Sequence, residues 1–245
     1  MPILYYGYYG YYSFDITYII LVVPCLILSL IASASVNSTF KKYSQQLSYR
    51  GITGAEAARK VLTSNGVSGV RIERVSGKLT DHFDPKANVI RLSDSVYDST
   101  STAAIGVACH EAGHAVQYAQ EYGPIKLRAA IIPVTNIGSK LAMPLILLGI
   151  ILETTMNNPN MYMLVYLGII LFSLSLVFQL VTLPVEFNAS RRAMQAIEEN
   201  AILTIEEEKG ARKTLTAAAM TYVAATAVAL AQVLRLVMIF ARRKD

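Results

Sequence analysis

The chain has 245 residues, of which 53% are hydrophobic and only 16% are charged. Soluble domains carry about 25% charged residues, so this composition excludes an ordinary soluble enzyme and indicates an integral membrane protein with a modest water-exposed part. The net charge of +5 is typical of a membrane protein whose cytoplasmic loops collect lysine and arginine. Because no basic run alternates with aromatic residues, we expect no nucleic-acid partner.

The first apolar run covers residues 16–34 and is long enough to span a bilayer as a helix. No lysine or arginine precedes it, so it lacks the basic region of a cleaved secretory signal. Lys41 and Lys42 follow it closely, which predicts an external amino terminus and a cytoplasmic next segment. We therefore expect residues 1–36 to form an uncleaved transmembrane anchor.

Residues 37–128 are expected to form a cytoplasmic part that mixes helix and sheet. Thr53 is a good N-cap for a first helix, which Asn65-Gly66 would end. The alternation of apolar and polar residues, together with a turn at residues 84–87, then predicts strands. These strands cover residues 70–75, 78–83 and 88–92.

A second helix of this part contains the most informative motif. Residues 98–102 supply capping residues for a helix that runs to about Glu121. Its middle is His110-Glu111-Ala112-Gly113-His114, an HExxH sequence that holds two of the three histidines of the chain. Helix positions i and i+4 share one face, so both imidazoles can bind one Zn²⁺ ion. The intervening Glu111 is then placed to accept a proton from a zinc-bound water.

Three further apolar stretches follow this helix. Two of them lie in residues 129–183 and predict a transmembrane hairpin, whose turn lacks lysine and arginine and therefore suits an external loop. Residues 184–216 are charged and predict a cytoplasmic helical segment that begins at Pro184. Residues 217–245 are a last apolar helix with a basic tail. Whether this helix crosses stays open, because a crossing would put the basic tail outside.

A catalytic zinc site needs three protein ligands and one open position for water. Glu186, just after Pro184, is expected at the membrane surface, at the depth of the motif helix. It could instead only complement the positive end of its own helix, but the need for a third ligand favours the metal role. His82, the remaining histidine, could be a ligand too, although its polar turn favours substrate binding or transition-state stabilisation.

The predicted chemistry is the hydrolysis of a peptide bond. Zinc lowers the pKa of its bound water towards ~7, and Glu111 accepts the proton while the hydroxide attacks a carbonyl that the metal polarises. His82, Arg191 or Tyr222 could donate a hydrogen bond to the oxyanion, and the sequence does not choose among them. Cys109 is interpreted as a small apolar residue on the flank of the helix.

In combination, these motifs closely resemble the YugP-type neutral zinc metallopeptidases of bacterial membranes. The resemblance covers nearly the whole chain and rests on TDHFDP, VIRLS, ACHEAGHAVQ, LPVEFNASRRA and KTLTAAAMTYVAA. A more distant similarity is to the HtpX-type membrane proteases, whose third ligand is a glutamate in an E-[FY]-x-A-D stretch. Ser190 stands here where that pattern has its aspartate.

The resemblance implies a mainly α integral membrane protein with a small α+β zincin-like cytoplasmic part around the HExxH helix. It implies Glu111 as the general base and one zinc ion bound by His110, His114 and Glu186. It also implies that an edge strand pairs with an extended substrate, for which residues 88–92 are our choice.

The sequence therefore favours a multi-pass zinc endopeptidase of the bacterial plasma membrane. Its active site would face the cytoplasm, and its partners would be the lipid bilayer and polypeptide substrates in or near it. The alternative is a non-catalytic scaffold or adaptor with a structural metal, which would have no need of Glu111 as a base. A transporter would place its ionisable residues within the spans, where Lys140 and Arg235 are the exceptions. The oligomeric state leaves no readable mark.

Overall fold

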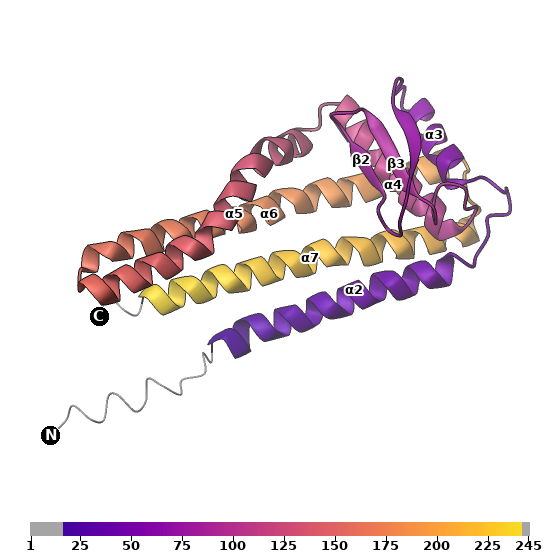
Figure 1. The fold of residues 1–245 in the computed structure, drawn as a ribbon. Coiled ribbons are helices and arrows are strands. Elements are labelled where there is room, and N and C mark those ends of the chain that lie inside the picture. Colours follow the sequence, from indigo (N-terminus) through magenta and orange to yellow (C-terminus); the bar gives the residue numbers. More distant parts are fainter. Residues whose placement is uncertain (1–16, 242–245) are drawn as a thin grey trace.

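The computed structural model describes residues 17–241 and shows a mainly helical chain with one small sheet (Figure 1). The elements, in chain order, are η1 (Tyr18–Val22), α2 (Val23–Tyr43), α3 (Gly54–Ser64), β1 (Arg71–Val75), β2 (His82–Asp84), β3 (Val89–Ser93), α4 (Thr102–Ala119), α5 (Gly123–Met156), η2 (Pro159–Met161), α6 (Tyr162–Glu199) and α7 (Ile205–Ala241).

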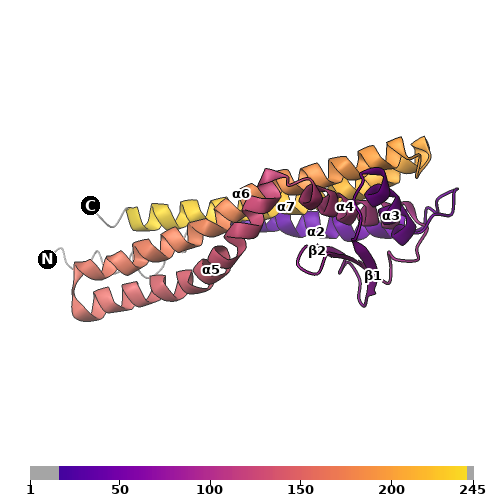
Figure 2. The same cartoon turned by 90° about the horizontal axis from the view of Figure 1, so that it is seen from above.

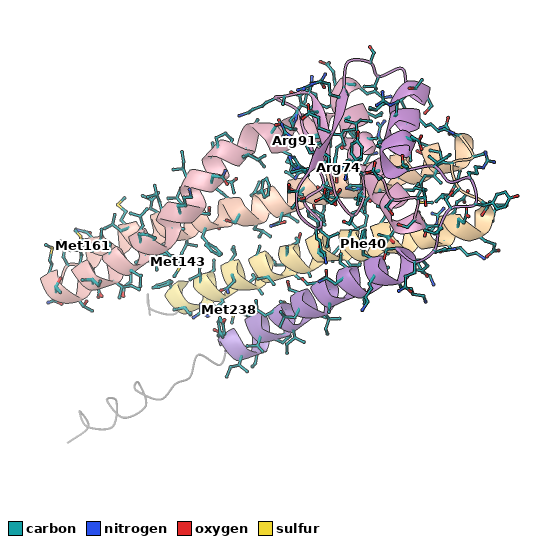
Figure 3. The ribbon with its side chains drawn as sticks, turned by 45° about the vertical axis from the view of Figure 1, so that its right-hand side comes forward. Phe40, Arg74, Arg91, Met143, Met161 and Met238 are labelled. Atoms are coloured by element: carbon teal, nitrogen blue, oxygen red, sulfur yellow. The ribbon has the colours of Figure 1, made fainter. Side chains whose placement is uncertain are left out.

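Four long helices extend side by side from the sheet-bearing end of the molecule (Figures 1 and 2). α5 packs on α6, α6 on α7, and α7 on α2, so these helices form a row. Each is long and apolar enough to cross a membrane, and few side chains in their apolar stretches are buried within the protein. Figure 3 shows Arg74 and Arg91 beside the sheet and Met143, Met161 and Met238 towards the opposite end. The row therefore has a polar end and an apolar end.

The predicted helix start at Pro184 is wrong, because α6 runs through this proline without a break. An internal proline removes one helical hydrogen bond and costs about 3 kcal/mol. In a long apolar helix, packing against neighbours offsets that cost. Likewise, residues 217–240 are not a separate helix, since α7 continues unbroken from Ile205. α4 ends at Ala119, and Gly123 begins α5.

β3 is the middle strand of the sheet, whose order is β1-β3-β2. It pairs in parallel with β1 and antiparallel with β2, so the prediction that residues 88–92 form an edge strand is wrong. β2 is instead an edge strand of the sheet. It is also shorter than the predicted strand over residues 78–83, because Leu79 has a left-handed backbone with a φ of 55°.

Two local predictions from turn and cap chemistry are confirmed. Thr53 caps α3 in a reciprocal capping box with Glu56. The Asp84 carboxylate accepts hydrogen bonds from the backbone N–H groups of Lys86 at 3.0 Å and Ala87 at 3.2 Å, which closes the turn between β2 and β3. These bonds set the antiparallel register that places His82 opposite Arg91.

The main hydrophobic core lies where α3, α4 and β3 meet the ends of α6 and α7. Its fully buried members include Val61, Ile90, Leu92, Ile105 and Ile197. Because α6 runs from the apolar end of the molecule into this core, its middle lies against α4. That crossing determines where Glu186 meets the HExxH motif.

Candidate metal centre

α4 and α6 bring the three predicted ligands together. Glu186 Oε2 lies 3.2 Å from His110 Nε2 and 3.5 Å from His114 Nε2, and the ligand atoms all lie within 4.8 Å of one another. A tetrahedral zinc ion with bonds of about 2.0–2.1 Å separates its ligand atoms by roughly 3.4 Å. The donor set and its spacing therefore fit one zinc ion.

Gly113, inside the motif, allows this close approach of the two helices. A Cβ atom at this position would lie 2.7 Å from the carbonyl oxygen of Ala189 on α6. Any larger residue at position 113 would clash with the backbone of α6, so the two helices would have to move apart. The sequence HEAGH thus provides two candidate ligands and the space for the helix that carries the third.

Gln117, one turn after His114, determines which nitrogen of that histidine faces Glu186. Its Nε2 donates to the Val185 carbonyl at 2.8 Å and to Asn188 Oδ1 at 2.9 Å. Because a backbone carbonyl only accepts, the amide oxygen must face the other way, towards His114 Nδ1 at 3.0 Å. The imidazole then carries its proton on Nδ1 and presents an unprotonated Nε2 to a metal.

Ser190 fixes the second histidine from the opposite helix. Its Oγ lies 3.1 Å from His110 Nδ1, one turn after Glu186 on α6. This serine occupies the place where the HtpX-type pattern has an aspartate. Its hydroxyl contacts Nδ1 of His110, just as Gln117 contacts Nδ1 of His114. Neither Gln117 nor Ser190 was identified from the sequence as a partner of the ligands, although both stand at helical spacing from a ligand.

Arg128 of α5 binds Oε1 of Glu186, the carboxylate oxygen that does not face the histidines. Its Nη1 donates to Glu186 Oε1 at 3.0 Å, while Oε2 faces the two histidines. The Glu186 side chain is only 3% exposed, so neither oxygen is left to bulk water. The carboxylate thereby presents a single oxygen to the two histidines.

A cavity of about 350 Å³ borders the site and is lined by His110, Glu111 and Glu186. Tyr222 of α7 and Asp81, which precedes β2, also line it. Glu111 is 9% exposed, so its carboxylate is within reach of a molecule that occupies this space. The arrangement leaves room beside the ligands, as a catalytic site requires.

The three residues considered as oxyanion donors are placed differently. Tyr222 lines the cavity beside Glu111, whereas Arg191 lines two hollows on other faces of α6. His82 is exposed on β2, with Nδ1 at 2.8 Å from the Thr80 carbonyl oxygen. The structure therefore brings Tyr222, but neither Arg191 nor His82, to the cavity wall.

The electrostatics of α4 suit a cation. Burial lowers the pKa of His114, but the hydrogen bond to Glu186 and the negative charges of Glu111 and Glu186 outweigh it, so the net pKa is raised. Burial raises the pKa of the Cys109 thiol, which keeps it neutral. Cys109 is fully buried in the hydrophobic core, in agreement with its interpretation as a small apolar residue.

Comparisons with known proteins agree with this geometry. Residues 18–241 match the family described as "Putative neutral zinc metallopeptidase". The chain is 49% identical over 228 residues to "Putative membrane protease YugP" of Bacillus subtilis (strain 168), an alignment that covers 93% of this chain and 98% of the relative. No solved structure matches the chain.

Proposed function

The chain belongs to this family of neutral zinc metallopeptidases, and on that premise we propose that it is a multi-pass membrane endopeptidase. It would bind one zinc ion through His110, His114 and Glu186 and hydrolyse peptide bonds of membrane or membrane-proximal polypeptides. The observation that carries the proposal is the position of Glu111. This carboxylate lies between the two histidines in sequence and lines the cavity together with His110 and Glu186, two of the three clustered residues.

The proposed roles follow from the contacts. Bound zinc would supply an acidified water and a Lewis acid for the substrate carbonyl. Glu111 takes the proton of the attacking water and passes it to the leaving amine. Tyr222 donates its hydroxyl proton in a hydrogen bond to the developing oxyanion. Gln117 keeps His114 in the tautomer that a ligand needs, and Ser190 helps to orient the ring of His110.

We propose that His82 acts in substrate binding through the free edge of β2. An extended peptide can add to an exposed sheet edge by main-chain hydrogen bonds. Leu79 and Asp81, which immediately precede β2, line the cavity, so this segment connects the cavity to the strand edge. A substrate chain that leaves the cavity along this segment would pass His82.

A scaffold with a structural metal is less well supported. Structural zinc sites are closed by four protein ligands, whereas among residues 17–241 three residues cluster here, beside a cavity. A structural role also gives no reason for a carboxylate such as Glu111 on the cavity wall.

The decisive test compares Glu111→Gln with the full-length wild-type protein purified in detergent. We expect the variant to retain zinc by elemental analysis and to lose cleavage of β-casein by at least about 10³-fold, because the amide cannot accept a proton. Glu121→Gln, an exposed change just beyond α4, is the matched control and should retain both properties. Cleavage by Glu111→Gln at a rate near that of the wild type would disprove the mechanism.

We also propose that the sheet-bearing end faces the cytoplasm. Lys41 and Lys42 lie at that end of α2, and the turn between α5 and α6 contains no lysine or arginine. In a background without Cys25 and Cys109, a membrane-impermeant maleimide should label Asn158→Cys on intact cells. Gln45→Cys and Ile205→Cys should react only after permeabilisation. The reverse pattern would invert the topology.

A further inference from the structure

The cavity beside the metal centre has a second wall, formed by α2 and α7, which the proposed chemistry uses only through Tyr222. α2 contributes Ser33, Val36, Asn37 and Phe40 to the lining. These residues recur at intervals of three and four and therefore form one face of the helix. Figure 3 shows Phe40 at the end of α2 that lies nearest the sheet. We call these four residues the α2 face.

α7 lies beside α2 and completes this wall of the cavity. Its lining residues are Thr214, Leu215, Ala218, Ala219, Thr221 and Tyr222, and α7 packs along α2. None of the lining residues of α2 and α7 carries a charge. The acidic and imidazole side chains that line the cavity are those of Asp81, His110, Glu111 and Glu186. All of them come from other elements.

The α2 face reaches into the apolar part of the helix. Ser33 precedes Lys41 by eight residues, a distance of roughly 12 Å along a helix that rises 1.5 Å per residue. The stretch Tyr18–Tyr43 is apolar enough to cross a membrane. The cavity therefore extends from the level of the basic residues into the span, where a charged substrate side chain would lose its hydration without an ion partner.

We propose that the α2 face selects the substrate. It binds an uncharged side chain next to the cleaved bond, with small and apolar groups of α2 and α7 on one side and Glu111 on the other. The amino-terminal span is then part of the active site as well as an anchor. This inference rests on the proposed peptidase function, and it adds the class of residue that the enzyme accepts.

The test is a pair of identical substitutions two residues apart on α2. Ser33→Leu places a larger side chain in the cavity, whereas Ser35→Leu changes an exposed position of α2 that does not line it. Both variants and the wild type are incubated with β-casein, and the cleavage sites are identified by mass spectrometry. Quenched peptides that differ only in the residue beside the cleaved bond then give kcat/KM.

We expect the wild type to cut beside uncharged residues. Ser33→Leu should lower kcat/KM for peptides with leucine or phenylalanine at that position by about fivefold or more relative to alanine, as expected when a subsite loses roughly one side chain of space. Zinc content should not change in either variant. Ser35→Leu should keep the wild-type preference. Identical preferences in the two variants would overturn the inference.

A binding measurement separates this inference from the peptidase proposal. A photo-crosslinking residue in place of Ser33, in the Glu111→Gln background, should capture β-casein, whereas the same residue in place of Ser35 should not. If the wild type binds zinc but cleaves nothing, the peptidase proposal fails, and crosslinking at position 33 still supports a polypeptide site. Equal crosslinking at both positions, or none at position 33, contradicts the α2 face.

Discussion

The two walls of the cavity are stabilised in different ways. On the α4 and α6 side, hydrogen bonds cross between the two helices, as in the contacts of Gln117 with Val185 and of Ser190 with His110. On the α2 and α7 side, the side chains of Asn37 and Thr214 bond to carbonyls of their own helices. Hydrogen bonds between elements pre-organise chemistry, whereas apolar packing leaves a surface that can change without disturbing the metal.

The largest expected effect comes from changing Glu186, the proposed third ligand. Glu186→Gln keeps the size of the side chain and an oxygen for Arg128 but removes the negative charge from the site. We expect zinc occupancy after dialysis to fall to near zero and cleavage of β-casein to fall with it, because a two-histidine site is incomplete. Elemental analysis is the measurement, and Glu199→Gln at the exposed end of α6 is the control. Full occupancy in Glu186→Gln would exclude this residue as a ligand.

On the facing wall, Tyr222→Phe removes one hydroxyl and leaves His110, His114 and Glu186 in place. If this hydroxyl stabilises the oxyanion, kcat should fall by about 10²–10³-fold, as for other donors of this kind. Zinc content and KM should change little. A comparable fall in zinc content would instead place Tyr222 among the groups that support the metal, and unchanged kcat would remove it from the mechanism.

The same contrast explains how much of the site could be predicted from the sequence. His110, Glu111 and His114 lie on one turn of one helix, so local periodicity is enough to bring them together. Thr53 and Asp84 were equally predictable, because caps and turns depend on neighbours in the chain. The proximity of Glu186 needed a tertiary argument, and part of that argument was wrong, because Pro184 lies inside α6 and does not begin a helix.

The remaining features depend on which surfaces meet in space. The order of the three strands cannot be derived from the alternation of apolar and polar residues alone. For this reason the edge strand was predicted at residues 88–92, whereas β2 lies at the edge and β3 in the middle. The position of the α2 face beside the cavity could not be predicted from the sequence for a similar reason. Its residues are ordinary for an apolar span, and only packing against α7 shows that they border the cavity.

An intermediate effect is expected when the hydrogen bonds of the metal wall are weakened while the ligands stay. Gln117→Leu removes the acceptor for His114 Nδ1–H and leaves the Val185 carbonyl without its donor. Outer partners of this kind typically change metal affinity by about 10–100-fold. We expect a loss in this range by chelator competition, whereas Ser33→Leu on the other wall should leave affinity unchanged. Equal affinities for Gln117→Leu and the wild type would show that the hydrogen bond does not position the ligand.

The smallest effect on the metal wall should come from Arg128, because its side chain is 27% exposed and water can partly replace it. Arg128→Met removes the donor to Glu186 Oε1 and should weaken zinc affinity by about tenfold, the lower end of the range for outer partners. Arg128→Lys restores the positive charge and one donor and should recover most of this loss. If both variants lose affinity equally, the guanidinium geometry matters more than its charge. If neither does, Glu186 is oriented by α6 alone, and the hydrogen-bonded wall consists of the contacts between α4 and α6.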